Sequence, residues 1–156
     1  MNIKIIAVGK IKEKYFEDAI FEFTKRLGGF CSFSVTEIPA EAIKDENLAQ
    51  KYMKAEAEKI LAQIKPQSFV ITMEIEGKEL SSVDFAEKIK LWSNEGHSEI
   101  AFIIGGANGL HESVKQISNF KLSMSKMTFL HQFARLILVE QIYRAFKILK
   151  GETYHK

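Results

Sequence analysis

Short apolar stretches alternate with longer segments of helical spacing along the whole chain, and this alternation constrains the fold more than any other feature. Repeated strand–helix units predict parallel strands joined by helical crossovers. Strands are predicted at Ile3–Val8, Ser32–Ile38, Phe69–Ile75, Ile100–Ile104 and Leu122–Met124. Helices are predicted at Glu13–Arg26, Asn47–Ile64, Ser81–Ser93, Leu110–Ile117 and His131–Lys150. The pattern therefore predicts an α/β fold, with a mainly parallel sheet and helices on both faces.

The size and composition of the chain predict a single domain over residues 1–156. Of its 156 residues, 46% are hydrophobic and 27% are charged, and the sequence has no internal repeat or linker. The one cysteine, Cys31, excludes an internal disulfide and a multi-cysteine zinc site, and we expect no metal. The start lacks the charged leader of a signal peptide, and no apolar stretch approaches the ~18–20 residues that span a bilayer. We therefore expect a soluble, cytoplasmic protein without a membrane partner.

The net charge of +2 is unevenly distributed along the chain. Residues 1–110 carry 14 Lys and Arg against 17 Asp and Glu, whereas residues 111–156 carry 8 against 3. A basic C-terminal end that follows a slightly acidic remainder of the chain is typical of a surface that meets a polyanion, which makes nucleic acid a candidate partner. The alternative is that these cations only solvate a surface, and charge by itself does not separate the two.

Three stretches of unusual composition are expected at the same edge of the sheet. They are Thr72–Glu74, the glycine-rich Gly105–Gly109, and Ser123–Phe129, in which hydroxyls and methionines are mixed. Because ligands bind beyond the carboxyl ends of the strands in open α/β sheets, these stretches predict a binding pocket. Glycines also make ordinary turns, and methionines also fill irregular core space. The glycines match neither a dinucleotide fingerprint nor a phosphate loop, which disfavours a nucleotide-dependent oxidoreductase.

The last predicted helix is apolar around most of its girth. Residues 136–139 are all apolar, and Phe133, Ile142, Phe146 and Leu149 widen the band. Such a helix must be buried on several sides, and a second copy of the chain is an economical source of the extra surface. The alternative is a helix buried within its own monomer.

The C-terminal third also carries specific motifs. They are Leu122–His131 (LSMSKMTFLH), Glu140–Lys147 (EQIYRAFK) and Gly151–Lys156 (GETYHK), and the runs Ala7–Lys10 (AVGK) and Ile103–Leu110 (IIGGANGL) accompany them. With these motifs, the chain closely resembles the ribosomal RNA large subunit methyltransferase H family, of the SPOUT superfamily, over essentially its whole length. Leu130 stands where that family commonly has proline.

The resemblance implies a fold, an assembly and a cofactor. The fold is an α/β domain whose C-terminal segment forms a trefoil knot, within an obligate homodimer. The cofactor is S-adenosylmethionine, the methyl donor, bound at Met73, Gly105, Met124, Ser125, Lys126, Met127, Thr128 and Phe129. These positions lie in the three stretches that the strand ends select independently.

The resemblance also implies the reaction, which is methylation of N3 of a pseudouridine in 23S ribosomal RNA within the assembled ribosome. It assigns Arg135, Tyr154 and His155 to catalysis and Tyr143 and Arg144 to RNA contact. We expect each site to combine the cofactor of one subunit with the C-terminal tail of the other. The alternative function is a non-catalytic module of the same fold that binds RNA or the ribosome.

Overall fold

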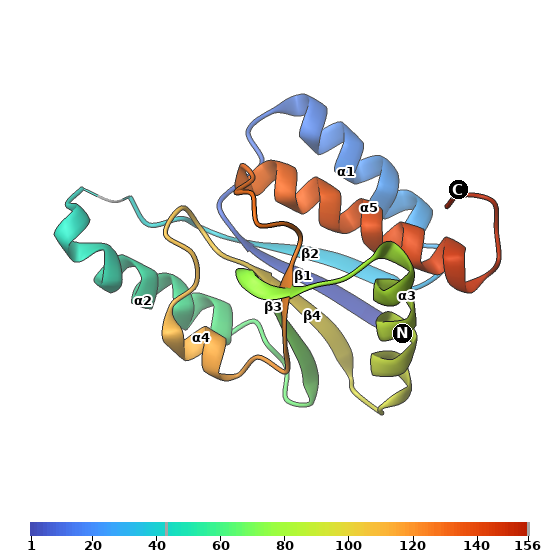
Figure 1. Cartoon of the computed structure of the whole chain (residues 1–156). Coiled ribbons are helices and arrows are strands. Elements are labelled where there is room, and N and C mark those ends of the chain that lie inside the picture. The colour runs from blue at the N-terminus through green and yellow to red at the C-terminus, as the bar shows by residue number, and fades with distance from the viewer. Residues whose placement is uncertain (43, 156) are drawn as a thin grey trace.

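The computed structural model describes residues 1–42 and 44–155. Its strands are β1 (Asn2–Val8), β2 (Ser32–Ile38), β3 (Ser68–Glu79), β4 (Glu99–Ile104) and β5 (Phe120–Ser123). They form one sheet in the order β2-β1-β4-β3-β5, in which every neighbouring pair is parallel (Figure 1). This arrangement confirms the predicted α/β fold with a parallel sheet.

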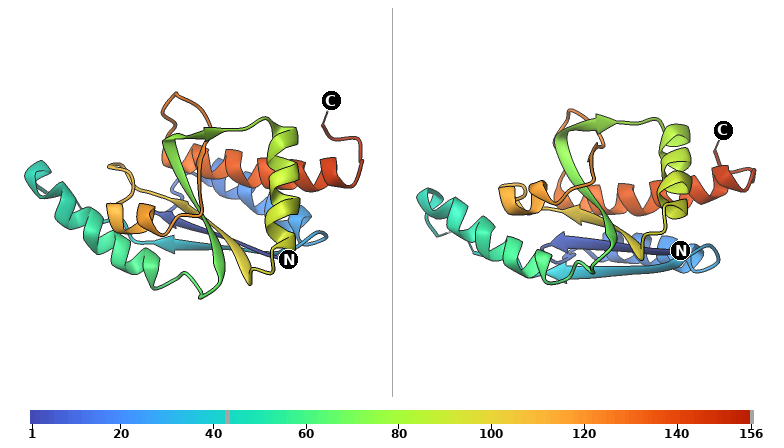
Figure 2. Two further views of the ribbon diagram at one scale, coloured as in Figure 1. Left: turned by 60° about the horizontal axis from the view of Figure 1, so that its bottom comes forward. Right: turned by 90° about the horizontal axis from the view of Figure 1, so that it is seen from below.

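Helices cover both faces of the sheet, as predicted. They are α1 (Lys14–Leu27), a 3-10 turn η1 (Glu46–Leu48) that leads into α2 (Ala49–Leu61), α3 (Ser82–Asn94), α4 (Glu112–Gln116) and α5 (His131–Leu149). On one face α5 packs against both α1 and α3, and on the other face α2 packs against α4 (Figure 2). Within residues 1–42 and 44–155, no helix has the length and apolar character needed to cross a membrane.

The alternation of side chains along the central strands creates two cores. Ile3, Ile5 and Ala7 of β1 point into the core beneath α1, α3 and α5, whereas Ile6 and Val8 point into the core beneath α2 and α4. All residues of β4 are buried, because this strand is the middle one of the sheet and is covered on both faces. The burial of apolar area in these two layers, at about 25 cal/mol per Å², is the main stabilisation of the sheet.

Helix α5 is held mostly by its own chain. It lies between α1 and α3, where Leu138, Val139, Ile142 and Phe146 are buried. Burial within the monomer therefore accounts for most of the apolar girth of this helix, and the girth by itself does not require a second copy. Phe133, near the N-terminal end of α5, stays 42% exposed.

Strand β3 is longer than the sequence predicts. The apolar pattern favours a strand that ends at Ile75, but β3 continues to Glu79 after a shift in its register against β5 that follows Met73. Gly77 permits this close pairing, since a Cβ there would lie 2.8 Å from backbone atoms of β5. The register shift therefore falls within the first predicted binding stretch, Thr72–Glu74.

Candidate cofactor-binding site

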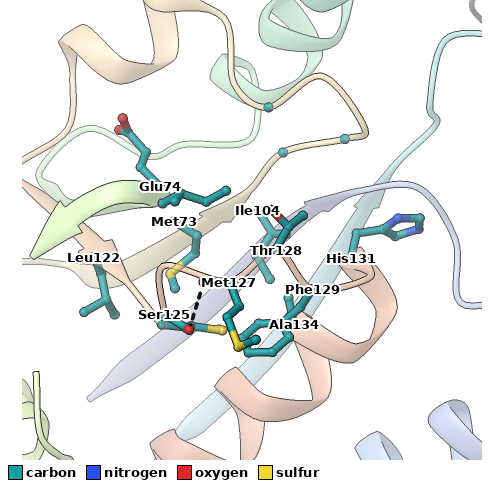
Figure 3. A pocket seen from close by; sticks show the side chains of 15 residues that line it. Met73, Glu74, Ile104, Leu122, Ser125, Met127, Thr128, Phe129, His131 and Ala134 are labelled. Carbon is teal, nitrogen blue, oxygen red and sulfur yellow. Dashed lines mark hydrogen bonds between the residues drawn. The ribbon is translucent and has the colours of Figure 1, made fainter. Parts of the chain in front are cut away.

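A cavity opens at the carboxyl ends of β3, β4 and β5 (Figure 3). Its walls are the turn of β3, the glycine loop after β4 and the loop from β5 to α5, and its lining comprises Met73, Glu74, Ile75, Ile104, Gly105, Gly106, Gly109, Leu122, Met124, Ser125, Met127, Thr128, Phe129, His131 and Ala134. Every residue that the resemblance assigns to the cofactor is part of this lining except Lys126, which is exposed on the same loop. The three stretches selected from the sequence thus meet in one cavity.

The glycine loop folds back tightly on itself. Gly106 and Gly109 form an isolated bridge, and Gly109 has a positive φ of 80°. A Cβ on Gly105 would lie 2.7 Å from the carbonyl carbon and oxygen of Gly109, which is closer than real contacts allow. We call this loop the cradle, because at its glycine positions no side chain stands between the backbone and a ligand.

The loop between β5 and α5 forms a tight turn fixed by serine hydroxyls. Ser123 Oγ donates to the carbonyl of Ser125 at 3.1 Å, and the backbone N–H of Met127 donates to Ser125 Oγ at 3.0 Å. Met127 is 73% exposed at the mouth of the cavity. Phe129 meets Phe133 edge to face, with ring centroids 6.0 Å apart. The mouth is therefore bordered by apolar side chains.

Glu74 is the acidic residue of the lining, and its charge is already compensated. Its carboxylate accepts the hydroxyl of Thr72 at 2.7 Å and lies 3.7 Å from the ammonium of Lys115 and 3.9 Å from that of Lys121. Figure 3 shows this carboxylate directed away from the methionines. Among the residues that the structure describes, no group of three or more His, Cys, Asp or Glu side chains is placed to hold a metal ion.

His131, the last residue of the motif Leu122–His131, is the other titratable residue of the lining, and the resemblance assigns it no role. It begins α5 beside the turn after β1, where a Cβ on Gly9 would lie 3.3 Å from its Nε2. Burial, followed by the nearby cations of Arg135 and Lys12, lowers the pKa of this imidazole. The ring is therefore neutral near pH 7 and keeps one nitrogen as an acceptor.

A comparison with protein families shows the family to which this chain belongs. The family model described as "Predicted SPOUT methyltransferase" matches residues 1–155. The chain belongs to this SPOUT methyltransferase family. Its fold is similar to the structure of a probable methylase family protein from Haemophilus influenzae Rd KW20, with a TM-score of 0.57, 16% identity, and coverage of 99% of this chain and 70% of that one.

A second solved structure is more distant. The SpoU methyltransferase AviRb from Streptomyces viridochromogenes, in complex with the cofactor AdoMet, has a TM-score of 0.46 and 8% identity, and the match covers 97% of this chain and 61% of that one. The likeness to the Haemophilus protein shows a shared fold, and the match to the family model shows that the chain is a member of the SPOUT methyltransferase family.

Arg135 of this SPOUT methyltransferase lies behind the cavity and is only 1% exposed. Its guanidinium donates to the carboxylate of Glu37 at 2.6 Å and to the carbonyl of Gly9 at 2.9 Å. These bonds tie α5 to the end of β2 and to the turn after β1. The burial and these contacts indicate that Arg135 positions α5, and the catalytic role implied by the resemblance stays a prediction.

The remaining C-terminal candidates gather around the carboxylate of Glu140. Tyr154 donates its hydroxyl to Glu140 at 3.0 Å, and Arg144 donates to the same carboxylate and lies 4.7 Å from the Tyr154 ring centroid. Burial and the contact with Glu140 raise the pKa of Tyr154, so its phenol stays protonated. Tyr143 packs edge to face on Tyr154, and the exposed His155 lies 3.4 Å from Arg144. None of these residues lines the cavity.

Proposed function

We propose that this chain is an S-adenosylmethionine-dependent methyltransferase of the ribosomal RNA large subunit methyltransferase H type, which methylates N3 of a pseudouridine in 23S ribosomal RNA of the assembled ribosome. The observation that carries the proposal is the meeting of three separate predicted stretches in one cavity of a SPOUT fold. The basic C-terminal third of the chain supports RNA as the partner.

The lining of the cavity suits this donor. Met73, Met124 and Phe129 offer an apolar surface for a flat base, and the hydroxyls of Ser125 and Thr128 offer polar contacts. The glycine loop can approach a ligand closely. Its fold depends on Gly105, since a side chain at this first position would collide with the backbone of Gly109. When bound, S-adenosylmethionine supplies a methyl group on a sulfonium, which N3 takes in an in-line displacement.

The residues of this chain act on that reaction mainly by positioning. Holding two reactants in line lowers a barrier by about 7–11 kcal/mol. A positioned general base contributes ~10²–10⁴-fold, or about 3–5 kcal/mol. A methyltransferase therefore does not need a conspicuous catalytic pair. In this proposal the protonated phenol of Tyr154 and the imidazole of His155 orient the acceptor base, and Tyr143 and Arg144 contact RNA.

The proposal includes a homodimer, because the cavity and the C-terminal tail cluster lie apart within a single chain. The cavity lies at the start of α5, whereas the tail cluster packs around Glu140 and Arg144, which lie 9 and 13 residues after His131, or about 14–20 Å along the helix axis. A second copy can bring its tail to the cavity of the first. The exposed apolar side chains of Tyr15, Met127, Leu130 and Phe133 support this arrangement, since they lie around the cavity mouth and the adjoining end of α1. The trefoil knot implied by the resemblance and the cytoplasmic location expected from the sequence belong to the same proposal.

Methyl transfer to ribosomes tests the function. The purified chain is incubated with S-adenosylmethionine and either intact ribosomes that lack the modification or free 23S RNA, and nucleosides are then identified by mass spectrometry. We expect N3-methylpseudouridine with intact ribosomes only. Calorimetric titration with S-adenosylmethionine separates the alternatives: donor binding without transfer to the ribosome points to another substrate, and the absence of a saturable donor site favours the non-catalytic binding module.

A further inference from the structure

His131 has no role in the proposed function, although it lines the same cavity as the residues assigned to the donor. Figure 3 shows its ring at the end of the cavity away from the methionines, directed toward the turn that follows β1. A donor bound among Met73, Gly105 and residues 124–129 leaves this end of the cavity to the second reactant. The ring therefore lies in the part of the lining that the residues assigned to the donor leave uncovered.

The imidazole is not engaged by its own chain. Its neighbours on α5, Gln132 and Arg135, do bond to their own chain. The side-chain oxygen of Gln132 accepts the backbone N–H of Lys12 at 2.7 Å, and Arg135 donates from both of its terminal nitrogens. Within the described residues, in contrast, neither ring nitrogen of His131 has a hydrogen-bond partner. Polar groups inside proteins are normally paired, so a half-buried ring with a free nitrogen in a cavity is available to a ligand.

The charged groups that surround the ring favour its neutral form. Arg135 lies one turn along α5, Lys12 follows β1, and Glu37 at the end of β2 is already paired with Arg135. Burial and the two cations lower the pKa of His131, which leaves an acceptor nitrogen near pH 7. The carboxylate of Glu74 already accepts the hydroxyl of Thr72 and lies near the ammonium groups of Lys115 and Lys121. His131 is therefore the lining side chain suited to take a proton.

We propose that His131 is a catalytic residue that accepts the ring N–H proton of the acceptor base during methyl transfer. This inference rests on the proposed function. The N–H bond of the base breaks, and its proton goes to the free imidazole nitrogen, which becomes an imidazolium. The base nitrogen uses the released electron pair to bond the methyl carbon, and the sulfonium sulfur keeps the pair of the broken carbon–sulfur bond. The imidazolium later returns its proton to water.

Replacement of the ring by an amide tests the proposal. His131→Gln keeps a hydrogen-bonding group without a titrating nitrogen, and His97→Gln is the matched control, because His97 lies before β4 at the opposite edge of the sheet. We expect the single-turnover rate of methyl transfer to fall roughly 10²–10⁴-fold in His131→Gln, with S-adenosylmethionine affinity within about twofold of the parent. The control should match the parent in both. A parental rate in His131→Gln, or a loss of donor affinity of about tenfold that explains the lower rate, overturns the proposal.

The pH dependence adds a readout that a merely structural role does not move. The parental rate should fall as the pH drops below the pKa of His131, and His131→Gln should lack this acid limb. A parental profile without it contradicts the proposal.

Nitrogen NMR of the parental imidazole, with S-adenosylhomocysteine bound, decides the same point without any RNA. We expect a neutral ring with one free nitrogen at pH 7. A ring that is protonated at pH 7, or bonded to the bound ligand, overturns the role of His131. If the parent binds this ligand but does not methylate ribosomes, the ribosomal substrate of the proposed function is wrong. The NMR result then still tests whether His131 offers a free nitrogen to accept a proton.

Discussion

Gly105 is the single residue on which the shape of the cavity depends most directly. A Cβ there would lie 2.7 Å from the backbone of Gly109, and backbone cannot move aside as a flexible side chain can. We predict that Gly105→Ala lowers the affinity for S-adenosylmethionine roughly tenfold or more and the free energy of unfolding by about 1–3 kcal/mol. Calorimetric titration and urea unfolding measure the two effects.

The matched control is Gly29→Ala, after α1. A Cβ at Gly29 would lie 3.7 Å from the carbonyl of Arg26, which is an ordinary contact, and the position is far from the cavity in the fold. This variant should bind the donor like the parent. Equal S-adenosylmethionine affinities for the two glycine variants would contradict a role of the loop at Gly105 in donor binding.

Single residues also show where sequence reasoning stops. Met73 and Gly105 could be placed at one cavity because parallel strands end at a common edge, and the motifs then named the same positions. The burial of Arg135 could not be predicted, since it depends on Glu37, a partner 98 residues earlier in the chain. His131 ends the motif Leu122–His131 without an assigned role, and its place in the cavity follows from the packing of α5 against the turn after β1.

Helix α2 carries a buried carboxyl beneath the glycine loop. Glu56 is 9% exposed, accepts the backbone N–H of Glu41 at 2.9 Å, and lies where a Cβ on Gly106 would be 3.4 Å from its Oε2. Burial raises the pKa of Glu56. The folded chain therefore binds this proton more tightly than the unfolded chain, so the resulting stabilisation is present at low pH and is lost as the pH rises through the folded pKa.

Glu56→Gln should remove this dependence, because the amide keeps an oxygen for Glu41 without a buried charge. We predict that its free energy of unfolding at pH 7 exceeds that of the parent by on the order of 1 kcal/mol, and that the difference shrinks toward pH 4. Urea unfolding at several pH values measures it, with Glu58→Gln on the exposed side of the same helix as the control. A difference that grows as the pH falls would contradict the assigned pKa direction.

At the level of elements, the sequence locates every strand and helix named in the fold but not all of their ends. The alternation of apolar and helical stretches places β1, β2 and β4 within one residue, because buried strands are bounded by polar or turn residues. The extension of β3 to Glu79 was not predictable, since it depends on a register shift against β5 and on backbone contact at Gly77. The predicted helix at 47–64 begins one residue earlier as η1 and ends in α2 at Leu61.

At the level of the whole molecule, the cavity and the tail cluster lie apart along α5. We therefore propose that each site is built by two chains. The cavity lies at His131 and the tail cluster packs around Glu140 and Tyr154. If each site combines one cavity with the tail of the other copy, two different defects placed on separate chains should complement each other. The chosen defects are Gly105→Trp, which fills the cradle, and deletion of residues 151–156, which removes the tail.

Each defect by itself should abolish methyl transfer, because every site of either homodimer then lacks the cavity or the tail. A heterodimer holds one site with an intact cavity from the tail-deleted chain and an intact tail from the Gly105→Trp chain. Co-expression with two affinity tags and sequential purification isolates it, and we predict about half of the parental rate per dimer. A verified, folded heterodimer without activity would mean that cavity and tail must come from the same chain, and recovery to about half would require the shared site, since no chain in that sample carries both parts.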